Sequence, residues 1–222
     1  NILMFYENER IYTVKEIMTD LKNHLDNKTP WSLVRWGDGF LKFAHAVLFN
    51  DEIQLRNICL KEGIPLQKVN KIMNLWKMSA NISNFIDTPQ VYLEENFWNR
   101  VRKKTKPMSK DTMLKIKNWR KIYGLSLFTN KNFCNPEINF LSCLKDLEDL
   151  ALPNILKGKK ICCITSYSDV FDKLLRYDDI TYIKIQGQNG EHYRGSFCKV
   201  VDIISETATN YDIWLVAGGE LG

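Results

Sequence analysis

An aspartate stands between two glycines at the end of an apolar run. Residues 32–34 can form a buried strand, and Arg35 and the tripeptide GDG at residues 37–39 follow almost at once. Glycine amides can approach a phosphate closely, arginine can bind it through two hydrogen bonds, and a carboxylate can bind a metal ion or a ribose. The alternative is a tight turn, because Asp-Gly pairs supply positive φ at little cost. The stretch therefore predicts either an anion site or a turn.

Three further loops carry the same kinds of residue, and each follows an apolar segment that can be a strand. They are residues 166–169 (SYSD), 187–194 (GQNGEHYR) and 218–220 (GGE). Backbone amides, hydroxyl groups and a few charges are the groups that hold a phosphate-bearing ligand. Ligands of open parallel sheets bind at the carboxyl ends of the strands, so we expect the four loops to lie at that edge of a sheet.

The elements that must position these loops alternate along the chain. A capping box at residues 13–16 opens a predicted helix that ends near residue 27, and a strand is predicted over residues 31–36, with a helix after the GDG turn. In the second half, strands are predicted at residues 123–128, 160–165, 181–186 and 212–217, and helices at 136–150, 169–176 and 196–205. This alternation predicts an α/β fold, a Rossmann-like and mostly parallel sheet with helices on both faces.

We expect a single domain over residues 1–222 with a helical insertion at about residues 51–121. Four amphipathic helices in a row are predicted there, the first closed by Gly63, and we expect them to contact the acceptor or a partner. The chain stops just after its last predicted strand, where another helix should begin. We therefore expect a truncated chain or a disordered tail.

Positive charge is concentrated in residues 100–121, which hold ten Lys or Arg and a single acid, Asp111. Such a stripe suits an anionic partner: nucleic acid, a membrane surface or an anionic glycolipid acceptor. Of these we expect a peripheral membrane contact or an anionic acceptor, and no nucleic acid. The alternative is a helix face that only meets water.

Other function classes find little support in the sequence. No stretch reaches the roughly 18 uncharged apolar residues of a membrane span, and the N-terminus lacks the apolar region of a signal peptide, so we expect a soluble, cytoplasmic protein. Six cysteines without Cys-x-x-Cys spacing predict reduced core thiols. There is no P-loop and no Gly-x-Gly-x-x-Gly after a strand. Residues 218–222 could pass for a methyltransferase loop, but they follow the last strand instead of the first.

The sequence SLVRWGDG, residues 32–39, closely resembles the SL-x-R-aromatic-GDGE signature of the bacterial glycosyltransferases of the GT-D fold. A weaker likeness extends over residues 10–50 and 120–222. Members of that family transfer a sugar from a nucleotide diphosphate donor to a glycan acceptor. The resemblance implies a nucleotide-sugar donor, with a UDP-sugar favoured, a glycan or glycoprotein acceptor, and Mn²⁺ or Mg²⁺ as the cofactor.

The resemblance also implies roles for single residues. Asp38 would act in catalysis by holding the metal and the diphosphate, because a divalent cation there neutralises the leaving group. Apart from the resemblance, the glycine-bounded loop at residues 187–194 predicts that Glu191 or His192 deprotonates the acceptor hydroxyl, and Glu220 would act as a base or bind the ribose. Simpler alternatives are an ion pair between Arg35 and Asp38 and, for Glu220, an exposed acid at a helix start. The donor-binding residues expected from the resemblance and from the four loops together are Arg35, Gly37, Gly39, Ser166, Tyr167, Gln186, Arg194, Gly218 and Gly219.

One residue departs from the signature, because Phe40 stands where the family has a glutamate. Three explanations are open: a site built from Asp38, phosphates and water, a replacement acid at Glu191 or Glu220, or a domain that binds no metal. The departure also leaves a second function open, a non-catalytic module that binds a nucleotide sugar or a glycan. A methyltransferase is the weakest of the three functions.

Overall fold

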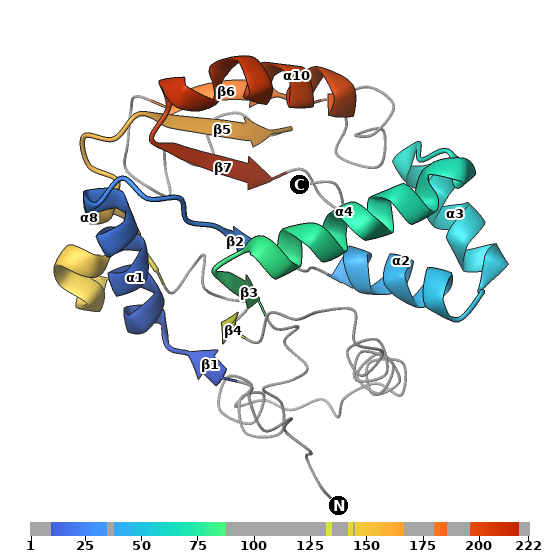
Figure 1. Ribbon diagram of the computed structural model, residues 1–222, viewed down its shortest axis with the longest axis horizontal. Helices are drawn as coiled ribbons and strands as arrows, with labels where there is room; N and C mark the ends of the chain where they lie inside the picture. Colours follow the sequence, from blue (N-terminus) through green and yellow to red (C-terminus); the bar gives the residue numbers. More distant parts are fainter. Residues whose placement is uncertain are drawn as a thin grey trace, which may run out of the picture.

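The protein pairs its strands in parallel and forms two sheets (Figure 1). The computed structural model describes residues 10–34, 38–87, 132–134, 142–143, 145–166, 180–185 and 196–217. Every strand pair in these ranges is parallel. The predicted α/β class and parallel pairing are therefore confirmed. In place of one sheet, however, the described residues form a four-stranded sheet and a three-stranded sheet.

The four-stranded sheet is built from short strands in the order β1-β4-β3-β2. Its members are β1 (Arg10–Tyr12), β2 (Leu33–Val34), β3 (Phe85–Asp87) and β4 (Asn132–Cys134). The strand predicted over residues 31–36 is shorter than expected at its start, because the amide of Ser32 donates to a side chain and not to a neighbouring strand. The other strands have three residues each, too few to show an alternating pattern.

The helical insertion predicted over residues 51–121 is interrupted by a strand, which corrects that prediction. β3 lies between β4 and β2, with Ile86 opposite Phe133 on one side and Val34 on the other. Phe85 and Ile86 are buried. Residues 85–87 therefore belong to the sheet. The strand predicted at residues 123–128 lies outside the described residues.

The three-stranded sheet has the order β6-β5-β7 and agrees well with the sequence prediction. β5 (Ile161–Thr165), β6 (Ile180–Lys184) and β7 (Ile213–Ala217) fall within two residues of the predicted strands. All five residues of β5 are buried. A central strand of a parallel sheet is covered on both faces, which explains its nearly continuous apolar sequence.

The helix α1 (Val14–Asp26) begins at the predicted capping box and packs on the four-stranded sheet. The Thr13 hydroxyl accepts a hydrogen bond from the Glu16 amide at 3.3 Å, and the Thr13 amide donates to the Glu16 carboxylate at 2.8 Å. Ile17 and Leu21 are buried against Phe85 and Cys134. The predicted helix is therefore present, and its apolar side faces the sheet.

Three helices form a bundle beside the sheets, on the right in Figure 1. They are α2 (Asp38–Leu48), α3 (Glu52–Glu62) and α4 (Val69–Ile82), with the short 3₁₀ helix η1 (Leu66–Lys68) before α4. α3 ends at Gly63, whose φ of 65° is the left-handed conformation that glycine adopts without strain. The bundle has a core of its own: Phe43, Cys59, Ile64, Val69 and Ile72.

The helix predicted over residues 136–150 is wrong in its described part. Residues 142–143 form a turn and Lys145–Leu150 form the 3₁₀ helix η2. Glu148 interrupts it with φ of 50° and ψ of −122°, so the residues cannot continue as an α-helix. The short helix α8 (Leu152–Ile155) follows.

Two helices complete the described elements of the second half. α10 (Cys198–Thr207) lies two residues later than its predicted span of 196–205, and the 3₁₀ helix η4 (Ala208–Asn210) extends it. The helix predicted at residues 169–176 lies outside the described residues. Among the described helices, none combines the length and apolarity that a bilayer crossing requires.

The cores of the two sheets meet at Leu152. This side chain packs against the cluster under α1 and also against the cluster of Leu156 and Ile161 at the start of β5. Within the three-stranded sheet, the residues just before β5 and β7 are joined, because the Lys160 amide donates to the Asp212 carboxylate at 2.7 Å. α8 therefore links one sheet to the other.

All six cysteines lie in the described residues, and no disulfide joins them. The prediction of core thiols holds for the four buried ones and fails for the exposed Cys198. Burial raises the pKa of the thiols of Cys59, Cys143 and Cys162 above the usual value. Fewer of these thiols are ionised at neutral pH than of an exposed one.

The capping box yields a stability prediction. Thr13→Ala removes the acceptor for the Glu16 amide and is expected to lower the free energy of unfolding by about 1 kcal/mol in urea denaturation. Thr19→Ala is the matched control, because Thr19 is exposed in the interior of the same helix and alanine favours helix there. Equal destabilisation by the two substitutions would contradict the capping role.

Thiol reactivity provides a second prediction. Cys198 is expected to react rapidly with an aromatic disulfide reagent in the folded protein, while the other thiols react only on unfolding, because attack needs both access and the thiolate. The absorbance of the released thiolate measures the number of fast thiols. The fast phase should disappear in Cys198→Ser, and a fast phase that persists in this variant would refute the assignment.

Candidate functional site

The predicted strand and helix are present on either side of residues 35–37, which lie outside the described residues. β2 ends at Val34, and α2 begins at Asp38. The prediction that the tripeptide precedes the helix needs correction, because Asp38 and Gly39 are the first two residues of α2. An acid is favoured in the first helical turn by the helix dipole, and this offsets the cost of a glycine at the second position.

The start of α2 can bind an anion in principle. The first amides of a helix have no partner within the helix, and the dipole adds positive potential there. α2 has 11 residues, so this potential is fully developed. Gly39 has no side chain to keep a ligand away from the backbone. The same position would hold Asp38 near any cation that accompanies the anion.

Packing fixes the direction of α2. Phe43, Ala44 and Ala46 are buried, and the ring of Phe43 meets the ring of Trp76 edge to face, with centroids 5.0 Å apart. Val47 packs against the same cluster. Because α3 and α4 enclose the helix through these apolar contacts, its first turn cannot swing without opening the core of the bundle.

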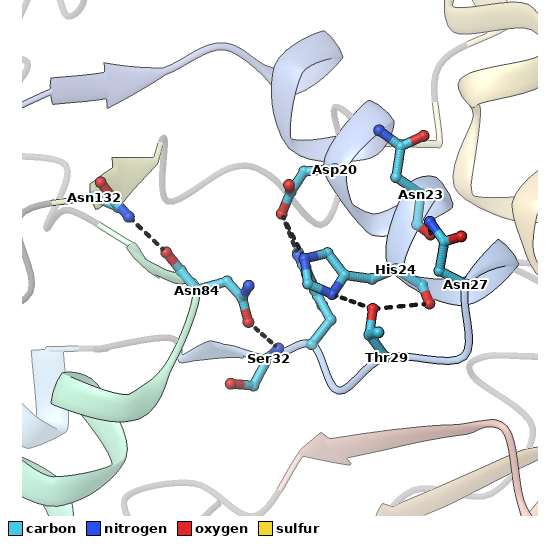
Figure 2. A network of polar contacts seen from close by, with 9 residues as sticks. Asp20, Asn23, His24, Asn27, Thr29, Ser32, Asn84 and Asn132 are labelled. Carbon is cyan, nitrogen blue, oxygen red and sulfur yellow. Dashed lines mark hydrogen bonds and ion pairs between the residues drawn. The ribbon is translucent and has the colours of Figure 1, made fainter.

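Asn84 holds the strand that leads into the site (Figure 2). Its side-chain oxygen accepts a hydrogen bond from the Ser32 amide at 2.9 Å, and its own amide donates to the Ser32 carbonyl at 2.9 Å. The Asn84 carbonyl accepts a further bond from the Asn132 side chain at 3.2 Å. One residue therefore joins the entries of β2 and β3 to β4.

A second polar network fixes the connection from α1 to β2. Trp31 donates its indole N–H to the carboxylate of Asp20 at 2.9 Å, and His24 lies 3.8 Å from the same oxygen. The hydroxyl of Thr29 is 2.8 Å from Nδ1 of His24 (Figure 2). Asn27 closes the helix by donating to the carbonyl of Asn23. The chain is thus held at several points before it enters β2.

The C-terminal half contributes one described site candidate, Ser166. It follows β5 directly, as predicted, and is partly buried. The carbonyl of the preceding Thr165 accepts a hydrogen bond from the amide of Ile185 at 3.1 Å, which keeps the ends of β5 and β6 together. Figure 1 draws β2, β5 and β7 with their arrowheads toward the same side.

The other predicted site residues lie outside the described part of the chain, as does the side chain of Asp38. These are Arg35, Gly37, Tyr167, Gln186, Glu191, Arg194, Gly218, Gly219 and Glu220. The basic stripe at residues 100–121 lies outside it too. Among the residues whose side chains are described, no group of three or more His, Cys, Asp or Glu could hold a metal ion.

Two features of the described region were missed from the sequence. Asn84 gave no signal, because its partners lie 52 and 48 residues away. The second feature is the burial of Glu62, the last residue of α3. It is only 2% exposed, and its Oε1 atom lies 3.4 Å from Nζ of Lys61. A charged residue directly before the glycine that ends a helix gives no hint of such burial.

The role of Asn84 can be tested with two substitutions. Asn84→Ala leaves the Ser32 amide without its side-chain acceptor and is expected to cost about 1 kcal/mol of unfolding free energy. Hydrogen exchange at Ser32 should accelerate more than at positions in β5. Asn84→Asp keeps an acceptor oxygen and should restore slow exchange, and Asn74→Ala on the exposed side of α4 should change nothing. Slow exchange in Asn84→Ala would refute the role.

Two sets of contacts hold the site. The hydrogen bonds between Asn84 and Ser32 form a polar anchor before β2, and the core around Phe43 forms an apolar anchor behind α2. Ser166 lies at the end of a strand in the second sheet. No protein-family model, no curated protein and no solved structure matches this chain.

Proposed function

We propose that the protein transfers a sugar from a nucleotide diphosphate donor, a UDP-sugar in the first place, to a glycan or glycoprotein acceptor. The observation that carries the proposal is the passage from β2 into α2, with Asp38 and Gly39 in the first turn of the helix. In the SLVRWGDG sequence, which resembles the GT-D signature, Leu33 and Val34 form the strand, and Asp38 and Gly39 begin the helix. Both positions favour a phosphate group.

The proposal includes a Rossmann-like arrangement in which the two sheets act as halves of one ligand-binding fold. β2 is the last strand of one sheet order and β7 the last strand of the other. Open α/β folds bind ligands at the carboxyl ends of strands, where the strand order reverses. Glycine-rich sequences follow both strands, at residues 37–39 and 218–219. A donor between β2 and β7 would meet both.

Asp38 and the donor phosphates form a sufficient ligand set for Mg²⁺ or Mn²⁺. Magnesium sites commonly use one or two carboxylates together with substrate phosphates and water. The glutamate of the family signature is therefore not required at Phe40. A bound cation would stabilise the negative charge on the departing diphosphate. A first helical turn is a suitable place for this chemistry, since its amides can also donate to phosphate oxygens.

The remaining roles follow the resemblance. Arg35 pairs with the diphosphate, and Glu191 or Glu220 takes the proton of the acceptor hydroxyl. The backbone of Gly37, Gly39, Gly218 and Gly219 and the side chains of Ser166, Tyr167, Gln186 and Arg194 bind the donor. Thiols that are not joined in disulfides suit a reducing compartment, and we place the protein in the cytoplasm.

Titration calorimetry tests the proposal directly. Uridine diphosphate is expected to bind in the presence of Mn²⁺ and more weakly without it, and guanosine diphosphate serves as the comparison. Asp38→Asn should weaken the Mn²⁺-dependent binding by about tenfold or more, because it removes a charged metal ligand. Asp202→Asn is the matched control, since Asp202 is exposed on α10.

A substitution that is expected to strengthen the binding provides a second test of the metal site. Phe40→Glu restores the acid of the family signature and should tighten Mn²⁺-dependent binding if Asp38 holds the metal. An absence of binding with and without metal would rule out the transferase. Metal-independent binding without hydrolysis of the donor would favour the binding module that Phe40 leaves open. Binding of S-adenosylmethionine instead would favour a methyltransferase.

A further inference from the structure

Exposed apolar side chains gather on the helical bundle. Nine large apolar residues are exposed in the described part of the chain, and seven of them lie between residues 49 and 82. Phe49 follows α2, Ile53 and Leu60 lie on α3, and Leu66 lies in η1. Single exposed apolar residues are ordinary, but a concentration of them marks an interaction surface.

α4 contributes the other three, and they lie on one side of the helix. Leu75, Met78 and Ile82 are 42%, 61% and 80% exposed. The exposed Lys71 precedes them at the same spacing of three and four residues, so the four side chains share a stripe. Val69, Ile72 and Ala80 bury the opposite side. We call Lys71, Leu75, Met78 and Ile82 the outer face of α4.

The charge on η1 and α4 has one sign. Residues 63–86 contain three lysines, Lys68, Lys71 and Lys77, and no aspartate or glutamate. The three lysines are exposed on η1 and α4. On α3, Arg56 pairs with the exposed Glu52 at 3.7 Å, so the positive charge beside the outer face comes from the three lysines. Apolar side chains flanked by basic ones are typical of helices that lie on membranes containing anionic lipids.

We propose that the outer face of α4 docks on an anionic lipid surface. Leu75, Met78 and Ile82 insert between the lipid head groups, and Lys68, Lys71 and Lys77 pair with lipid phosphates. Figure 1 shows α3 at the right-hand end of the molecule and α4 running from there toward β3. The surface does not include the start of α2.

The charges also argue against a second copy of the chain as the occupant. Two outer faces packed together would bring their lysines close to each other, and this part of the chain has no acid to pair with them. Polar and basic residues separate the exposed apolar side chains of α3 from one another, and a head-group layer tolerates such an interrupted surface.

Vesicle sedimentation with the full chain tests the proposal. The protein should sediment with vesicles of phosphatidylcholine and phosphatidylglycerol in equal amounts, and not with phosphatidylcholine alone. Salt should reduce the binding. The triple variant Leu75→Ser, Met78→Ser, Ile82→Ser should lose about tenfold or more of the partition coefficient. The variant Lys68→Gln, Lys71→Gln, Lys77→Gln should lose a similar factor.

The matched control carries Lys145→Gln, Lys157→Gln and Lys199→Gln, three exposed lysines elsewhere, and should bind like the wild type. If the serine variant does not fold, as judged by its thermal transition, the lysine variants still decide. Failure to bind anionic vesicles would overturn the proposal, as would full binding by the variants of the outer face. Loss of binding only when lysines of residues 100–121 are replaced would overturn it too. A dimer that the serine substitutions dissociate, without vesicle binding, would identify a second copy instead.

Discussion

A strand of two residues cannot hold its own register, and the candidate site depends on such a strand. β2 offers only Leu33 and Val34 to its neighbour. A shift by one residue would turn both side chains to the other face of the sheet and would move the start of α2. Asn84 prevents the shift from outside the strand, because it bonds both backbone groups of Ser32. The approach from α1 adds the bond between Trp31 and Asp20.

The site is held by two different kinds of force. The polar anchor at Ser32 is directional, because a hydrogen bond weakens steeply when its angle changes. The apolar anchor behind Phe43 depends on volume and not on direction. Together they leave a connection of three residues, 35–37, between two fixed points. This is a common way to place chemistry on a loop while a rigid scaffold sets its ends.

The sequence predicted best those features whose cause is local. The capping box at Thr13 and Glu16 and the glycine stop at Gly63 require only neighbouring residues, and both are present. β5 was predicted because a fully buried strand is apolar throughout. β1, β3 and β4 were missed because three residues carry no period. The helix at residues 136–150 was wrong because nothing local announced the unusual backbone of Glu148.

For the site, sequence reasoning identified the strand ends but not what holds them. Ser166 directly follows a parallel strand, as expected from alternating elements, whereas Asp38 and Gly39 begin the helix that comes after β2. The hydrogen bonds of Asn84 could not be predicted from the sequence. An asparagine before a strand looks like an ordinary turn residue, and the partners of Asn84 are remote in sequence.

Leu152 contributes to the packing of both sheets. It packs in both clusters and stands in a four-residue helix that has little stability of its own. Loosening either cluster removes part of what holds α8, and the other cluster then loses a contact as well. Leu152 therefore couples the packing of the two described clusters. A ligand that rigidified one sheet would slow the breathing of the other without touching it.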